Sequence, residues 1–269
     1  MLPATRAQPL TSWLDGQDLE RMNRYREYLE FYDGRQWIGR RRAGETRLVL
    51  NYARVLVRKA VSYLFPAPVT FNVIPDQDGQ EAVALRAERA LNAIYARHDQ
   101  HTVDFQSALD AAVLGDGAFK VTWSGRRQAP LVAPVDPASL WAWWEPDNPN
   151  EVHRVVQRYA ITSEEAGRLF PGARASDPWN ANGPERLTVV EDWQEERYQV
   201  VLDGETIVER PNPYGFIPYV IYPNVARPHE FWGASDLEDL LDVCRELNQR
   251  MTTISRILHV AGYPITVLE

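Results

Sequence analysis

The sequence lacks the features that define several protein classes. It has one cysteine, Cys244, in 269 residues, which excludes an internal disulfide framework and a zinc site built on clustered cysteines. No apolar run approaches the roughly 20 residues that a membrane span needs. No continuous apolar segment follows a basic start at the N-terminus, so we expect no secretory signal. These absences predict a globular protein that is made in the cytosol.

Basic residues are also fewer than acidic residues. Lysine and arginine number 29 against 37 aspartate and glutamate residues, and the net charge of −8 argues against a generic basic nucleic-acid binder. The one basic concentration is the stretch "GRRRAGETR", which holds Arg40, Arg41 and Arg42, together with Arg35, Arg54, Arg58 and Lys59. These arginines are candidate contacts for nucleic acid or for an acidic partner, although a solvated loop is the simpler interpretation.

Hydrophobic spacing predicts helices first and strands afterwards. Apolar residues that recur at three and four predict four helices, over 17–33, 50–65, 80–98 and 102–114. In the second helix, one side is expected to carry Leu50, Ala53, Leu56 or Val57, Ala60 and Leu64. Short alternating runs then predict a β-rich part over 118–222. With one long helix after it, the pattern indicates an α+β fold with a helical appendage.

Two local motifs give sharper predictions within the β-rich part. Asp203-Gly204 lies between two alternating runs and indicates a two-residue hairpin turn. Thr162 followed three residues later by Glu165 indicates a capping box at the start of a short helix.

The last helix is the most regular element, predicted over 235–261. Ser235 followed by Glu238 indicates a capping box at its start, and Gly262 and Pro264 end it. Its apolar residues alternate at spacings of three and four, which is typical of a coiled-coil seam. They are Leu237, Leu240, Cys244, Leu247, Met251, Ile254, Leu258 and Ala261. A seam of this kind needs a partner helix, either from another copy or from sequence not present here; docking on the chain's own β layer is the alternative.

The remaining groups of candidate residues indicate no catalytic centre. His98 and His101 in "HDQH" have a spacing that can chelate a metal, but a coherent further ligand set is missing, so a surface helix end is the favoured interpretation. Trp141, Trp143 and Trp144 can stack sugars or bases, although core packing is favoured. We therefore assign no catalytic residue, no metal and no cofactor.

Several segments resemble the portal proteins of tailed double-stranded DNA bacteriophages. "YLEFYDGRQW" is similar to the family's Tyr-Tyr-x-Gly-x-Gln segment, with Phe31 in place of one tyrosine, and "LNYARVLVRKAVSYLFPAPVTF" is similar to the helix that follows it. "AVLGDGAFKVTW", "VDPASLWAWWEPDNPNEVHRVVQRYAI" and "NPYGFIPYVIYPN" follow in the family's order. The last helix resembles the first stem helix at Gly233, Ser235, Asp236, Leu237, Asn248, Gly262 and Pro264.

The resemblance implies a non-enzymatic ring subunit, dodecameric at one capsid vertex, through which double-stranded DNA is packaged and ejected. It implies a wing domain over 1–232 and, over 233–269, a stem helix followed by the truncated start of a clip domain. The second stem helix, tunnel loop and crown of the family have no counterpart here, so we expect a truncated or partial chain. The implied partners are other copies of the chain, the terminase large subunit, the major capsid protein and a head–tail adaptor, with no membrane; the implied location is the virion.

Two other classes of function stay open. The chain is alternatively a polysaccharide- or nucleic-acid-binding module that uses the cluster Trp141 to Trp144 and the arginine-rich loop. A metal-dependent hydrolase built on His98 and His101 is the third and least favoured reading.

The acidic balance makes a prediction about DNA. A channel wall that neutralised many phosphates would hold the DNA, because each neutralised phosphate adds salt-dependent affinity. We expect the isolated protein to bind duplex DNA no tighter than about 10⁻⁴ to 10⁻⁶ M at physiological salt. A fluorescence anisotropy titration measures this, and a nanomolar dissociation constant would contradict it.

Overall fold

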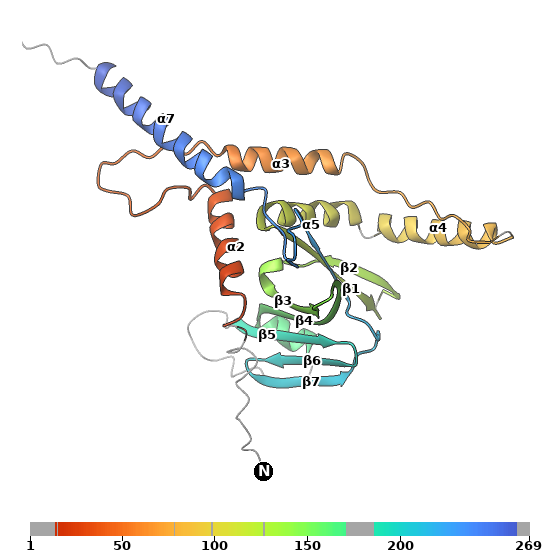
Figure 1. The fold of residues 1–269 in the computed structure, drawn as a ribbon. Helices are drawn as coiled ribbons and strands as arrows, with labels where there is room; N and C mark the ends of the chain where they lie inside the picture. Colours follow the sequence, from red (N-terminus) through yellow and green to blue (C-terminus); the bar gives the residue numbers. More distant parts are fainter. Residues whose placement is uncertain are drawn as a thin grey trace, which may run out of the picture. The chain divides into compact units, whose positions relative to one another are not determined.

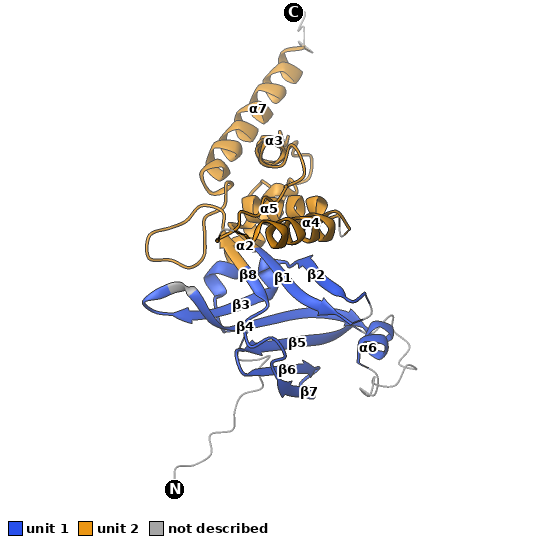
Figure 2. Ribbon diagram, turned by 90° about the vertical axis from the view of Figure 1, so that its right-hand side faces the viewer, with its two compact units in different colours: residues 1–22, 118–220 blue, residues 23–117, 221–269 orange. Residues whose placement is uncertain are grey.

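The chain divides into two compact units. The computed structural model describes residues 14, 16–77, 79–97, 99–125, 127–170 and 186–262. Residues 1–22 and 118–220 form one unit, called here the sheet unit, and residues 23–117 and 221–269 form the other, the helical unit (Figure 2). The architecture mixes helices with sheets, as the sequence predicted (Figure 1).

The sheet unit is built on a five-stranded antiparallel sheet. Its strands follow the order β3-β4-β5-β6-β7 and comprise β3 (Leu140–Glu145), β4 (Asn148–Thr162), β5 (Arg186–Gln194), β6 (Arg197–Leu202) and β7 (Glu205–Pro211). A second sheet has the order β2-β1-β8, with β1 (Asp116–Ser124), β2 (Ala129–Pro134) and β8 (Tyr219–Pro223). The short 3-10 helix η1 (Pro137–Ser139) leads into β3.

Both faces of the five-stranded sheet are covered. Neighbouring valines in β4 and β5 point to opposite faces because side chains alternate along a strand. One face packs Val156 and Val190 with Trp141 and Leu14. The other face packs residues of β4, β5 and β6 against α6 (Ser163–Leu169), with the members Ile161, Ala166, Leu187, Val189, Val200 and Leu202. This burial on both sides explains the valine-rich runs in the sequence.

The two local motifs of this unit are confirmed. Asp203 and Gly204 join β6 to β7 with φ angles of 45° and 88°, the left-handed pair that a tight hairpin turn requires. The Thr162 hydroxyl accepts from the Glu165 N–H at 3.3 Å, and the Glu165 carboxylate accepts from the Thr162 N–H at 2.8 Å. The reciprocal capping box therefore begins α6.

The helical unit contains the helices that the sequence placed before and after the strands. They are α2 (Leu19–Tyr32), α3 (Tyr52–Leu64), α4 (Glu81–Arg97), α5 (Gln100–Leu114), η2 (Glu238–Leu240) and α7 (Leu241–Gly262); the first turn of α2 belongs to the sheet unit. The first four begin and end within two residues of the predicted bounds. None of the helices among the described residues is long and apolar enough to cross a membrane.

The prediction for the buried side of α3 is wrong in part. The helix buries Ala53, Val57 and Val61, whereas Leu56 and Leu64 are 50% and 66% exposed. These buried positions recur every four residues, and α3 contacts both α5 and α7. The buried residues are small, which allows α3 to lie close to both neighbours and leaves its larger apolar side chains outside.

A buried carboxylate organises one end of the sheet unit. Glu191 of β5 accepts from Lys120 of β1 at 2.6 Å, from the Tyr159 hydroxyl at 2.8 Å and from the Trp193 indole N–H at 2.9 Å. Burial acts to raise the pKa of Glu191, but the Lys120 charge and the hydrogen bonds to the carboxylate together lower it below the ordinary value of 4.5. Burial and the Glu191 charge raise the pKa of Tyr159. The ion pair therefore joins the two sheets.

We expect Glu191→Gln to destabilise the sheet unit by about 3–5 kcal/mol at neutral pH, because Lys120 loses the charge that compensates its burial. Urea unfolding followed by tryptophan fluorescence measures the loss, and Glu195→Gln, at an exposed hairpin position, is the matched control. Because the folded pKa of Glu191 is lowered, its contribution is present above about pH 4.5 and disappears as the pH falls through the folded pKa. Equal stability of the two variants at pH 7 would contradict the prediction.

Candidate functional site

The start of α7 is held by carbonyl groups at the end of α5. The Ser235 hydroxyl lies 2.5 Å from the carbonyl oxygen of Val113 and 3.1 Å from that of Ala112, and it accepts from the Leu237 N–H at 3.0 Å. The predicted capping box with Glu238 is therefore wrong, since the Glu238 carboxylate forms an ion pair with Arg227. The chain passes through η2, and the regular α-helix begins at Leu241, six residues after Ser235.

Asp116 lies at the centre of the same junction and is fully buried. Its carboxylate accepts from the Tyr25 hydroxyl of α2 and from the Gly233 N–H at 2.8 Å. Two glycines let the backbones meet: a Cβ on Gly115 would lie 2.9 Å from the Gly233 carbonyl oxygen, and a Cβ on Gly233 would overlap the Gly115 carbonyl. The "GDG" stretch is thus a backbone crossing that fixes where the last helix begins.

A buried network of three amide side chains, Gln36, Asn51 and Asn248, holds the middle of α7. The Asn248 amide donates to the Gln36 side-chain oxygen at 2.6 Å, and its oxygen accepts from the Leu50 N–H at 2.7 Å. The Gln36 amide in turn donates to the Asn51 side-chain oxygen at 2.9 Å, and Asn51 caps α3 through the Arg54 N–H. One network therefore joins the segment after α2, the start of α3 and the buried face of α7.

The amide network lies in a face of α7 that turns away from the predicted seam. Cys244, Asn248 and Thr252 recur every four residues, and Thr252 accepts from the Leu48 N–H at 3.0 Å. Burial raises the pKa of the Cys244 thiol, which packs as a small apolar group. A helix turns about 100° per residue, so residues four apart move steadily around its surface. The stripe of Cys244, Asn248 and Thr252 therefore diverges from the predicted seam, whose spacing alternates between three and four.

The predicted seam is consequently covered at its start and exposed at its end. Leu237 and Cys244 are buried in the single chain, and Leu240, Leu247 and Met251 are half-buried. Ile254 is 47% exposed and Leu258 is 66% exposed. The apolar surface that the seam offers to another molecule therefore lies in the last turns of the helix.

The arginine-rich loop faces the same last turns of α7. It borders a groove of about 1160 Å³ whose other wall includes Thr253, Arg256 and His259. Arg40, Arg41 and Arg42 are exposed. Arg47 shapes the loop, donating to the Glu45 carboxylate at 2.9 Å and to the carbonyl oxygens of Gly39 and Arg40. The hydrogen bond from Arg47 is the main cause that lowers the pKa of Glu45.

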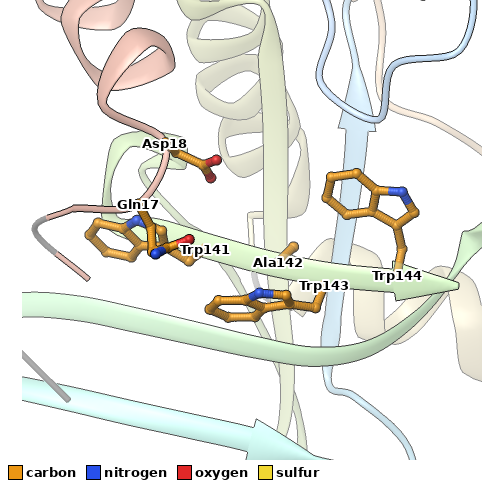
Figure 3. A pocket seen from close by; sticks show the side chains of 6 residues that line it. All are labelled: Gln17, Asp18, Trp141, Ala142, Trp143 and Trp144. Atoms are coloured by element: carbon orange, nitrogen blue, oxygen red, sulfur yellow. The ribbon is translucent and has the colours of Figure 1, made fainter. Parts of the chain in front are cut away.

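Trp141 and Trp143 pack into the core of the sheet unit, whereas Trp144 is half-buried and lines the pocket that Figure 3 shows. Trp141 is 2% exposed, and the Arg158 guanidinium lies 4.9 Å from its ring centroid. Arg154 lies 4.9 Å from the ring centroid of Trp143. With Gln17 and Asp18 the cluster borders a pocket of about 230 Å³, but Trp141 has no open ring face on which a base or sugar can stack.

The described residues contain no group of three histidine, cysteine or carboxylate side chains placed to hold a metal. His98 lies outside the described residues. His101 packs edge-on against Phe65, with ring centroids 6.5 Å apart, and Asp104 accepts from Tyr95 and Gln100. These side chains are used in helix packing.

Sequence reasoning missed the roles of Asp116 and of the amide network. The signals were present: an acidic residue between two glycines, and an asparagine in the middle of a long helix, beside its apolar seam. An isolated aspartate in a glycine-rich turn is more often a solvated turn residue, so only the tertiary contacts identify its partners.

Comparison with known proteins identifies one family. The family model for "Phage portal protein, SPP1 Gp6-like" matches residues 12–260. This range includes the arginine-rich loop, the backbone crossing and the amide network. No curated protein sequence matches the chain.

We expect Asn248→Ala to lower the stability of the helical unit by about 2–4 kcal/mol, because each buried polar group left unpaired costs about 1–3 kcal/mol. The Leu50 N–H and the Gln36 side-chain oxygen lose their partner. Hydrogen exchange at the Leu50 amide and urea unfolding measure the effect. Gln249→Ala, at the next and exposed position, is the control, and unchanged exchange in Asn248→Ala would refute the role of the network.

Proposed function

The chain belongs to the SPP1 Gp6-like family of phage portal proteins, and we propose that it is a subunit of the ring through which DNA enters and leaves the capsid. The family is structural and non-enzymatic. Apart from family membership, the observation that best supports a ring is the difference between the two halves of α7. Its first half is anchored by buried polar contacts, whereas Ile254 and Leu258 in its second half are exposed.

An exposed apolar stripe on a well-anchored helix favours contact between copies. The two exposed seam residues together with Ile257, at 59% exposure, present apolar surface that a single chain leaves in water. Equivalent helices placed around a channel would cover this surface with another side of the same helix in the next copy. We therefore propose the residues up to about 232 as the wing and α7 as the first stem helix, with Leu240, Leu247, Met251, Ile254 and Leu258 facing neighbouring helices.

The acidic charge fits a conduit for double-stranded DNA. A net charge of −8 per subunit, multiplied around a ring, repels phosphates weakly, so DNA passes without being held by many ionic contacts. We propose passage without sequence specificity, in packaging into the capsid and in ejection from it. The exposed Arg40, Arg41 and Arg42 are then local contacts for nucleic acid or an acidic partner and not a gripping surface.

The remaining assignments follow from the family. We propose a dodecamer at the portal vertex of the virion, made in the host cytoplasm and acting as a head–tail connector. Its partners would be the terminase large subunit, the major capsid protein and a head–tail adaptor.

Ring assembly is the experiment that tests this proposal. We expect the wild-type chain to form rings in negative-stain microscopy and native mass spectrometry. Ile254→Asp combined with Leu258→Asp is expected to raise the concentration needed for assembly by at least about tenfold, because each change buries an unpaired charge between helices. Val260→Asp, at a 67% exposed position on another side of the helix, is the control. A wild-type chain that stays monomeric would contradict the proposed function.

A further inference from the structure

The outward face of α3 carries larger apolar side chains than its buried face. The buried side consists of Ala53, Val57 and Val61, each at most 1% exposed. Larger apolar side chains face solvent, with exposed fractions of 53% for Tyr52, 59% for Val55, 50% for Leu56, 69% for Tyr63 and 66% for Leu64. At about 3.6 residues per turn, Tyr52, Val55, Leu56 and Tyr63 lie on one side of the helix, and exposed apolar side chains gathered in this way mark a surface that another molecule covers.

Positive charge lies within and beside this side of the helix, with Lys59 among these residues and Arg58 at their edge. Arg58 and Lys59 are exposed, and α3 contains no acidic residue. The Lys59 ammonium group lies 4.6 Å from the ring centroid of Tyr63, so the charge sits directly beside the apolar stripe. A matching partner would be a helix with an apolar centre and acidic flanks.

The first turns of α7, with the end of η2, have this complementary pattern. Asp239, Asp242, Val243 and Glu246 follow a spacing of three, one and three, which places them on one helix face. All four are exposed, with the Asp242 side chain at 95% and Val243 at 65%. The helix dipole favours acidic residues near a helix start, but it gives no reason for an exposed valine among them.

We propose that the outward face of α3 in one copy packs on the first turns of α7 in the next copy of the ring. This inference rests on the proposed function and supplies a lateral contact outside the seam. A ring needs two different faces on each subunit that fit one another head to tail. Arg58 and Lys59 would then meet Asp239 and Asp242 of the neighbour, and α3 would lie between its own α7 and the neighbour's.

Charge reversal tests the pairing. Arg58→Glu with Lys59→Glu is expected to raise the concentration for half-assembly by at least about tenfold, because like charges then face each other. Asp239→Lys with Asp242→Lys is expected to do the same. All four changes in one chain restore the opposite charges and are expected to restore rings. An equimolar mixture of the two reversed chains is expected to form rings in which the two chains alternate one to one, because every contact between unlike chains pairs opposite charges.

Matched controls separate this contact from net charge and from misfolding. Arg86→Glu with Arg89→Glu makes the same charge change on exposed positions of α4 and is expected to leave assembly unchanged. Circular dichroism verifies that every variant is folded. If the wild type forms rings and the α3 variant assembles equally well, or if the fourfold variant fails to recover, the inference is overturned while the proposed function stands. A wild-type chain that never assembles would overturn both.

Discussion

The position of the last helix depends on a requirement that buried polar groups be paired. Asn248 is 1% exposed, and its amide can be satisfied only while Gln36 and the Leu50 backbone stay where they are. Gln36 in turn depends on Asn51, whose side chain also caps α3. Because a half-satisfied buried network is costlier than an apolar contact, the network accepts few alternative arrangements. It therefore specifies the register of α7 more strongly than its leucines do.

A second constraint acts at the beginning of the same helix. Asp116 joins α2 to the turn at Gly233, and Ser235 binds the end of α5, so three segments distant in the sequence meet within one helical turn. Glycine is required at the crossing because any side chain would overlap a carbonyl group. The resemblance to portal proteins includes Gly233 and Ser235, and their contacts give a physical reason for those residue types.

Turn and capping motifs whose partners lie within a few residues could be predicted from the sequence. Side chains that bind groups distant in the sequence could not. Asp203-Gly204 and the box of Thr162 and Glu165 form as expected, because each is satisfied by atoms within a few residues. The same pattern at Ser235 and Glu238 does not form a box, since two carbonyl groups of α5 take the serine and Arg227 takes the glutamate. The four-residue recurrence on α3 was visible, but spacing alone does not say which side of a helix finds neighbours. The roles of Gln36 and Asp116 depend on partners far away in the sequence and could not be read from it.

The uneven support of α7 has a mechanical consequence. A rod clamped along its first half and free beyond it is a cantilever, and a sideways load on the free end acts as a torque at the clamp. From Asn248 to Gly262 the lever arm is about 20 Å, at 1.5 Å per residue. A force on the C-terminal end of α7 would therefore act first on the hydrogen bonds that Asn248 and Thr252 accept from the backbone N–H groups of Leu50 and Leu48. These two residues lie in the segment that leads into α3.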